Sequence, residues 1–123
     1  MNSNDETMAG EIFGDLIYSY SRAQAIEDGV LVDVSERAKR AGIRYPTACT
    51  HGVWALIGTM PESCTAEESA RLAAMLAALL AAIRQARGTD RVHFEALGER
   101  LYAMCGPGDT AAPVITILLE GED

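Results

Sequence analysis

The apolar positions of the chain follow two different periods, and the change between them falls close to Gly88. From Thr65 to Arg87 the apolar residues recur at the i, i+3, i+4 and i+7 spacing that lines one face of an α-helix. The residues of this face are Leu72, Met75, Leu76, Leu79, Leu80 and Ile83. Thr65 and Glu68 form a capping box, and Gly88 suits the left-handed residue that ends a helix. The pattern therefore predicts one long helix over about 65–87.

After Gly88 apolar and polar residues alternate, which is the period of a β-strand. Three strands are predicted, at 92–97, 101–105 and 113–119. Turns are expected at 98–100 and 106–109, where glycine recurs. The segment 113–119 is apolar at successive positions, which predicts that both of its faces are covered. A central place in the sheet, or a partner on the open side, would provide that cover.

A fourth strand is predicted at 30–34, where the run VLVDV is rich in β-branched residues. One long helix followed by three consecutive strands, with this strand added, is typical of an α+β fold. We expect the long helix to pack on a mainly antiparallel sheet as a two-layer sandwich. In the segment 50–58 we expect Trp54, Leu56 and Ile57 to be buried, but the pattern fits either a helix or a strand.

Two short helices are predicted in the first third of the chain. Ser21 is a good N-cap for the first, RAQAIED, and Gly29 can end it in the left-handed conformation. Ser35 is expected to cap the second, ERAKRA, which Gly42 would end in the same way.

The length of 123 residues predicts one domain, which we place at 11–123, after a disordered polar tail at 1–10. The longest uncharged stretch, 72–83, is far too short to cross a bilayer. The N-terminus lacks the basic start and apolar centre of a signal peptide. Three widely spaced cysteines form no disulfide framework and fit a reducing compartment. We therefore expect a cytoplasmic protein that does not span a membrane.

The charge of the chain is strongly negative and unevenly distributed. The formal net charge is −8, from 18 acidic and 10 basic residues, which disfavours direct nucleic-acid binding and attracts basic proteins. The first candidate binding surface is an acidic set that comprises Asp15, Glu27, Asp28, Asp33 and Glu36. It is followed by a basic set that comprises Arg37, Lys39, Arg40 and Arg44. Together they form either an ordinary solvated surface or a bipolar recognition surface.

The residues that could support catalysis or bind a metal form no recognised motif. Cys49 and His51 are the only close cysteine–histidine pair, and their spacing does not match that of zinc ligands, so no metal or cofactor is expected. A cysteine nucleophile would need Cys49, Cys64 or Cys105 together with His51 or His93. Nothing local marks an activated thiol, apart from the position of Cys64 just ahead of the long helix. We expect no catalytic residue and no enzymatic activity, with a small cysteine-dependent hydrolase as the alternative.

Two segments near the ends of the chain carry a resemblance to a known family. The first is IFGDLIYSYSRAQAIEDGVLVDVSERAKRAGIRYP, and the second is CGPGDTAAPVITILLEGED. They resemble an uncharacterised family of small bacterial proteins that are carried largely on plasmids and phages. Because that family has no assigned activity, cofactor or catalytic residue, the resemblance implies only a setting, that of an accessory protein of a mobile genetic element.

The sequence therefore favours a non-enzymatic accessory protein that binds a host or phage protein through the acidic set. In the setting that the resemblance implies, the partner would be a nucleic-acid-binding complex of host defence. Carboxylates would replace phosphates in its basic channel, in an anti-CRISPR-like or anti-restriction-like manner. The alternative is a structural or regulatory homodimer without a defence role. Its contacts would be the alanine-rich face of 73–82 and the apolar last strand.

Overall fold

A computed structural model of the chain describes residues 21–58, 64–86 and 89–122. Its helices, in chain order, are α2 (Arg22–Glu27), α3 (Ser35–Ala41), α4 (His51–Trp54) and α5 (Ala66–Gln85). Its strands are β1 (Leu31–Asp33), β2 (Thr47–Thr50), β3 (Arg91–Ala96), β4 (Glu99–Pro107) and β5 (Pro113–Leu119). The predicted α+β class, with one long helix and a mainly antiparallel sheet, is confirmed.

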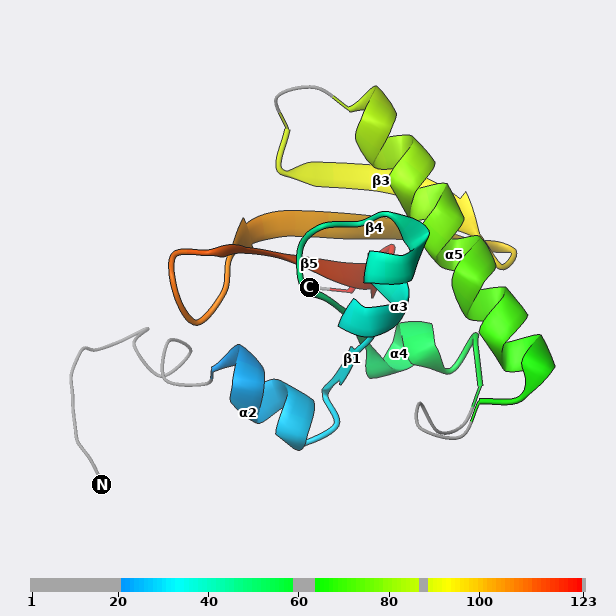
Figure 1. The fold of residues 1–123 in the computed structure, drawn as a ribbon, viewed down its shortest axis with the longest axis horizontal. Coiled ribbons are helices and arrows are strands. Elements are labelled where there is room, and N and C mark those ends of the chain that lie inside the picture. Colours follow the sequence, from blue (N-terminus) through cyan, green and yellow to red (C-terminus); the bar gives the residue numbers. More distant parts are fainter. Residues whose placement is uncertain (1–20, 59–63, 87–88, 123) are drawn as a thin grey trace.

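The strands form one mixed sheet in the order β1-β2-β5-β4-β3 (Figure 1). β5 is central, in agreement with its apolar sequence, which only Thr116 interrupts; β4 is antiparallel on one side of it and β2 parallel on the other. In the parallel pair, Ala48 lies opposite Thr116 and Cys49 opposite Ile117. This parallel pair was not predicted, and it brings together segments that are far apart in the sequence.

The segment 50–58, for which the pattern allowed a helix or a strand, changes from one to the other at Thr50. Thr50 ends β2, and its hydroxyl accepts a hydrogen bond from the Val53 N–H at 3.2 Å, so the same residue caps α4. Trp54 and Ile57 are buried as predicted, whereas Leu56 is only half-buried. Because Thr50 both ends a strand and caps a helix, neither the strand period nor the helix period dominates this segment.

The hydrophobic core lies between the sheet and the helices α3 and α5, which stand in front of the sheet in Figure 1. α5 contributes to it four residues of the predicted apolar face, namely Leu72, Met75, Leu76 and Leu79. Leu80 and Ile83, farther along the same face, are half-buried. Burying a leucine or methionine side chain contributes about 2 kcal/mol, so α5 is held mainly by packing on the sheet.

Two of the predicted helix starts are confirmed. The Ser21 hydroxyl caps α2 by accepting a backbone N–H at 3.0 Å, and Thr65 and Glu68 form the complete capping box of α5. Gly29 and Gly42 follow their helices at φ 82° and 105°, in the left-handed region that was expected of them. Short-range capping chemistry therefore predicts these ends correctly.

Two other helix ends differ from the prediction. Ser35 is the first residue of α3 and not its N-cap; Val34 occupies the cap position, and the Asp33 carboxylate accepts the Ser35 N–H at 3.0 Å. Asp33 is thus the residue whose side chain stabilises the helix start. α5 ends at Gln85, short of the predicted end near Gly88, and Gly88 itself lies outside the described residues.

The hairpin between β3 and β4 turns one residue earlier than predicted, at Leu97 and Gly98, which both have positive φ. Two such residues in succession make the tight turn that matches the twist of paired strands. β4 is longer than the predicted 101–105, because Gly106 and Pro107 continue the pairing with β5. The turn predicted at 106–109 therefore begins later.

The tail expected at 1–10 lies outside the described residues, as does Asp15 of the acidic set. None of the helices that the structure describes combines the length and the apolar character needed to cross a bilayer.

Candidate functional site

An apolar groove of about 380 Å³ lies between the loop that follows α3, the C-terminal half of α5 and the strands β3, β4 and β5. Aliphatic side chains from all of these parts form its walls, among them Ile43, Leu80, Ile83, Val92, Ala103 and Ile115. Concave apolar surfaces with a few polar groups at their margin are the usual form of binding sites. The groove is therefore the main candidate site.

The loop that forms one wall of the groove is fixed at both ends. Gly42 ends α3 at φ 105°, and a Cβ at this position would lie 3.2 Å from Leu80 Cδ2, so the loop leaves α3 in close contact with α5. The Ile115 N–H then donates to the Pro46 carbonyl at 2.9 Å and ties the loop to β5. The Tyr45 carbonyl accepts a further bond at 2.9 Å. Because its backbone is held in this way, Tyr45, 41% exposed, is a preplaced aromatic contact at the groove.

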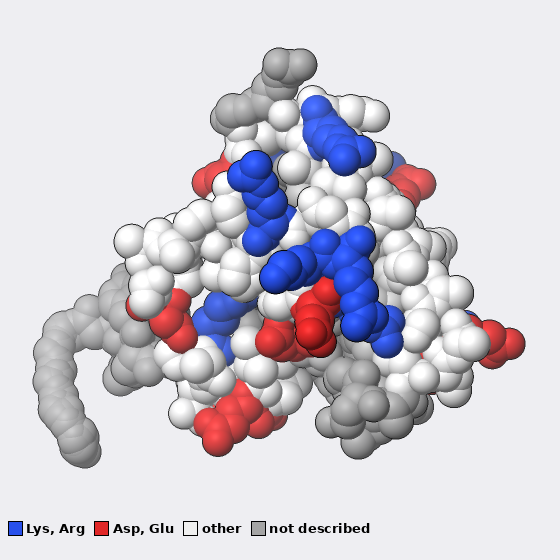
Figure 2. All heavy atoms as spheres, viewed as in Figure 1, with Lys and Arg blue, Asp and Glu red and all other residues white. Residues whose placement is uncertain are grey.

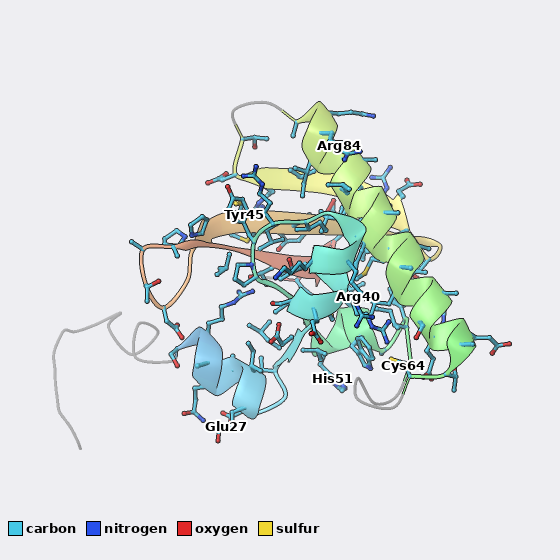
Figure 3. All side chains as sticks on the ribbon, in the orientation of Figure 1. Glu27, Arg40, Tyr45, His51, Cys64 and Arg84 are labelled. Carbon is cyan, nitrogen blue, oxygen red and sulfur yellow. The ribbon has the colours of Figure 1, made fainter. Side chains whose placement is uncertain are left out.

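The structure places the basic set on α3 and on the loop that follows it. Lys39, Arg40 and Arg44 are exposed, Arg37 is half-buried, and none of them forms an ion pair with an acid among the described residues. Arg84, near the C-terminal end of α5, is exposed beside the groove residue Ile83 and was not part of the predicted basic set (Figure 3). Figure 2 shows Lys and Arg side chains gathering over α3 and α5.

The acidic set is divided between two roles. Glu27 (Figure 3) and Asp28 are exposed at the end of α2. Glu36 is exposed in the first turn of α3. The Asp33 carboxylate instead accepts two hydrogen bonds from Ser35, from its N–H at 3.0 Å and from its hydroxyl at 2.6 Å. Asp33 therefore has a structural role at the start of α3. Of the other three exposed acids, Asp28 accepts a hydrogen bond from Gln24 Nε2 at 3.0 Å.

Arg22 and Asp109 are charged residues whose roles the sequence did not indicate. The Asp109 carboxylate, in the loop between β4 and β5, accepts the first two backbone N–H groups of α2 at 2.7 and 3.0 Å. The Arg22 guanidinium donates to the Thr116 hydroxyl at 2.6 Å and to the Ile115 carbonyl at 2.7 Å. Burial lowers the pKa of Arg22, and the charges of Asp33 and Asp109 oppose that change. Together these bonds attach α2 to the sheet.

Two of the three cysteines lack the surroundings of a catalytic thiol. Cys49 is fully buried, and burial, with a smaller contribution from the charge of Glu122, raises its pKa from 9.0 to about 12. Its thiol therefore stays protonated at neutral pH and is a poor nucleophile. Cys105 is exposed at the groove, but it has no hydrogen bond to a histidine within the described chain. His93 instead faces Glu120, with Nδ1 and Oε1 3.3 Å apart.

The remaining candidates for metal or thiol chemistry lie elsewhere on the surface. His51 is exposed at the start of α4, and Cys64 is half-buried just before α5 (Figure 3). In the described ranges, no three His, Cys, Asp or Glu side chains are grouped so that they could hold a metal ion. The groove, with Arg44 in its lining and Arg84 next to the lining residue Ile83, is thus the site that the geometry develops furthest.

Comparison with known proteins places the chain in a family. The model of a family of unknown function, DUF6573, matches residues 10–123. No curated protein and no solved structure matches the chain. The matched residues include the whole sheet, α5 and the basic set, and thus reach beyond the two terminal segments that carry the resemblance. The chain therefore belongs to the DUF6573 family of unknown function.

Proposed function

We propose that this protein acts without catalysis, by holding a segment of a partner protein in the apolar groove beside Arg44 of the basic set. The observation that carries the proposal is the groove of about 380 Å³, with Arg44 in its lining and Arg84 next to the lining residue Ile83. An apolar centre with a charged border is the usual anatomy of a protein–protein contact.

The partner segment that we propose is acidic and carries one aliphatic or aromatic anchor side chain. The anchor would bury against Leu80 and Ile83, where removal of apolar surface from water contributes about 25 cal/mol per Å². Carboxylates on either side of the anchor would pair with Arg44 and Arg84, which form no ion pair with any acid of the described residues. Tyr45 would add contact area at little entropic cost, because few rotatable bonds must be fixed.

A protein segment fits this groove better than a nucleic acid. Proteins that bind single strands stack successive bases on several aromatic side chains, whereas Tyr45 is the only aromatic residue among the described lining residues. The formal net charge of −8 also repels a phosphate backbone. Salt screens charges that are more than about 10 Å apart. The carboxylates of a short bound peptide would therefore be attracted by the nearby arginines and would be little affected by the net charge of the whole protein.

The two terminal segments resemble accessory proteins of plasmids and phages. This resemblance supports a protein of host defence as the partner. In that role the protein would inhibit by occupying a surface and not by a reaction. The acidic set supports a second candidate, the binding of a basic partner, because Glu27 and Asp28 are exposed together at the end of α2 (Figure 3).

Selection from a random peptide library, followed by fluorescence anisotropy with the selected peptides, tests the proposal. We expect enrichment of peptides in which acidic residues flank an aliphatic or aromatic residue. The double variant Arg44→Glu/Arg84→Glu should weaken binding of such a peptide at least about tenfold, since two reversed contacts cost about 1 kcal/mol each.

The matched control is Arg100→Glu, which makes the same charge change at a side chain that is 75% exposed on β4 and outside the groove lining. It should leave the affinity unchanged. The proposal is wrong if the groove variant binds the peptide as tightly as this control does. Enrichment of basic peptides, with binding lost in Glu27→Lys/Asp28→Lys, would support the second candidate instead.

A further inference from the structure

We infer that the outer edge of β3 is the surface through which two copies of this chain pair, so that their sheets continue into one another. This inference does not depend on the function of the groove. Among the described residues β3 is the last strand of the sheet, and only one of its edges is paired there, with β4. β5, whose apolar sequence had suggested a contact with a second copy, lies between β2 and β4 and offers no unpaired edge.

Alternate residues of β3 direct their backbone groups toward β4 and away from it. The Cys105 N–H donates to the Asp90 carbonyl at 2.8 Å, so Asp90 and every second residue after it face β4. The residues between them direct their N–H and carbonyl groups to the open edge. These outward residues are Arg91, His93 and Glu95.

At one end of the open edge the outward groups are already used. The Arg91 N–H donates to the Thr89 hydroxyl at 3.2 Å, and that hydroxyl donates to the Arg91 carbonyl at 3.0 Å. The outward N–H and carbonyl groups of His93 and Glu95 bond to none of the residues that the structure describes. An exposed strand with unpaired backbone groups is a template for pairing with another chain.

The free groups select one antiparallel register between two copies. If His93 of each copy lies opposite Glu95 of the other, all of these groups form hydrogen bonds across a two-fold axis, and the bonds of Arg91 to Thr89 remain intact. The two Phe94 side chains then face each other at a non-hydrogen-bonded position, where opposite side chains are closest. An isologous contact of this kind forms a closed dimer and not a fibre.

The side chains are self-complementary in this register. His93 and Glu95, with side chains 58% and 75% exposed, meet as a base and an acid on the open face of the sheet. On the face of the sheet that α5 covers, Val92 of one copy lies opposite Ala96 of the other, and the two Phe94 residues lie opposite each other. Within one chain Glu95 contacts Arg100, with 3.5 Å between Oε2 and Nε of two exposed side chains. Such an exposed ion pair is too weak to prevent the contact of Glu95 with His93 of the second copy.

The helix next to this edge carries small exposed residues. α5 packs against β3, and its exposed surface includes Ala73, Ala77 and Ala81. The alanine-rich face of 73–82, expected from the sequence to contact a second copy, thus lies on the helix that borders the pairing edge.

Sedimentation equilibrium and a charge exchange test the dimer. The wild type should have twice the 13.1 kDa mass of the chain. His93→Glu places an acid opposite Glu95, and Glu95→Lys places a base opposite His93, so each variant alone should dimerise about tenfold more weakly. A mixture of the two variants should form heterodimers. In a heterodimer the new acid of one chain faces the new base of the other, and the second pair is the original one of Glu95 with His93. Loss of folding cannot produce such a rescue.

Arg91→Glu is the matched control, because it reverses a charge on the same strand and the same face. In the proposed register Arg91 does not lie opposite His93 or Glu95, so the dimer should persist. A wild type of 13.1 kDa at the highest attainable concentration would overturn the inference. It would also be overturned by failure of the two exchanged variants to form heterodimers, or by a loss of dimer in Arg91→Glu equal to that in His93→Glu.

Discussion

Replacing Gly42 with alanine would show how far the wall of the groove depends on a residue without a side chain. Gly42 ends α3 at φ 105°, and an added Cβ would lie 3.2 Å from Leu80 Cδ2. Two costs therefore arise, one from a backbone conformation that L-residues rarely adopt and one from crowding against α5. Gly29 ends α2 at φ 82° with no atom within 4 Å of an added Cβ, so Gly29→Ala incurs only the first cost.

The two costs can be estimated separately. A left-handed backbone costs a non-glycine residue about 1–2 kcal/mol, and the reduced freedom of the unfolded chain offsets about 0.4–1 kcal/mol of it. Gly29→Ala should therefore lower the free energy of unfolding by about 1 kcal/mol. Crowding that turns Leu80 away from its preferred rotamer adds about 1 kcal/mol. For Gly42→Ala we expect a total loss of about 2 kcal/mol.

Urea unfolding followed by circular dichroism measures both variants. With an m-value of about 2 kcal/mol per M, the midpoint should fall by about 1 M for Gly42→Ala and by about half as much for Gly29→Ala. In a Leu80→Ala background the crowded atom is absent, and Gly42→Ala should cost no more than Gly29→Ala does. Equal losses for the two glycine variants in the wild-type background would refute the close contact between the loop and α5.

Two further predictions concern the core and the attachment of α2. From pH 9.0 to about 12 the unfolded Cys49 thiol ionises while the folded one stays protonated, so the folded state binds more protons and the free energy of unfolding falls as pH rises. That part of the fall should be missing in Cys49→Ala, and an identical pH profile for both proteins would contradict the raised pKa. Asp109→Ala removes the carboxylate that accepts two N–H groups of α2 and should cost about 1 kcal/mol in urea unfolding, with a smaller loss for Asp109→Asn. An unchanged midpoint in Asp109→Ala would show that α2 is not held by this loop.

Sequence reasoning succeeded where neighbouring residues carry the whole signal. The capping box of α5 needs only Thr65 and Glu68, which are three residues apart and meet in any helix that starts there. The alternation in β3 follows from the geometry of the strand alone. Such features do not depend on what the rest of the chain contributes, so their prediction does not require the fold.

Prediction from the sequence failed where two side chains compete for one capping position, or where the capping residue is distant in the sequence. Ser35 and Asp33 both carry an oxygen suited to a helix start, and only the backbone path decides that Asp33 accepts the N–H. For α2, the local cap Ser21 was visible, but the second cap is Asp109 from a distant hairpin. No local pattern identifies a cap that arrives from another part of the chain.

The groove shows why a site can be harder to predict than a core. Leu80 and Ile83 occupy the same apolar face of α5 as Leu72 and Leu79, and helical spacing predicts that all four point toward the sheet. Spacing does not say what covers each of them. Leu72 and Leu79 are buried, whereas Leu80 and Ile83 are half-buried and line the groove, because the loop held by the Ile115–Pro46 bond leaves this end of the helix partly open. The position of that loop follows from the parallel pairing of β2 with β5, which unites distant segments and has no local sequence signal. Residues of one periodic face are therefore divided into core and candidate site by tertiary topology, and Arg44 of the basic set lies at the groove for the same reason.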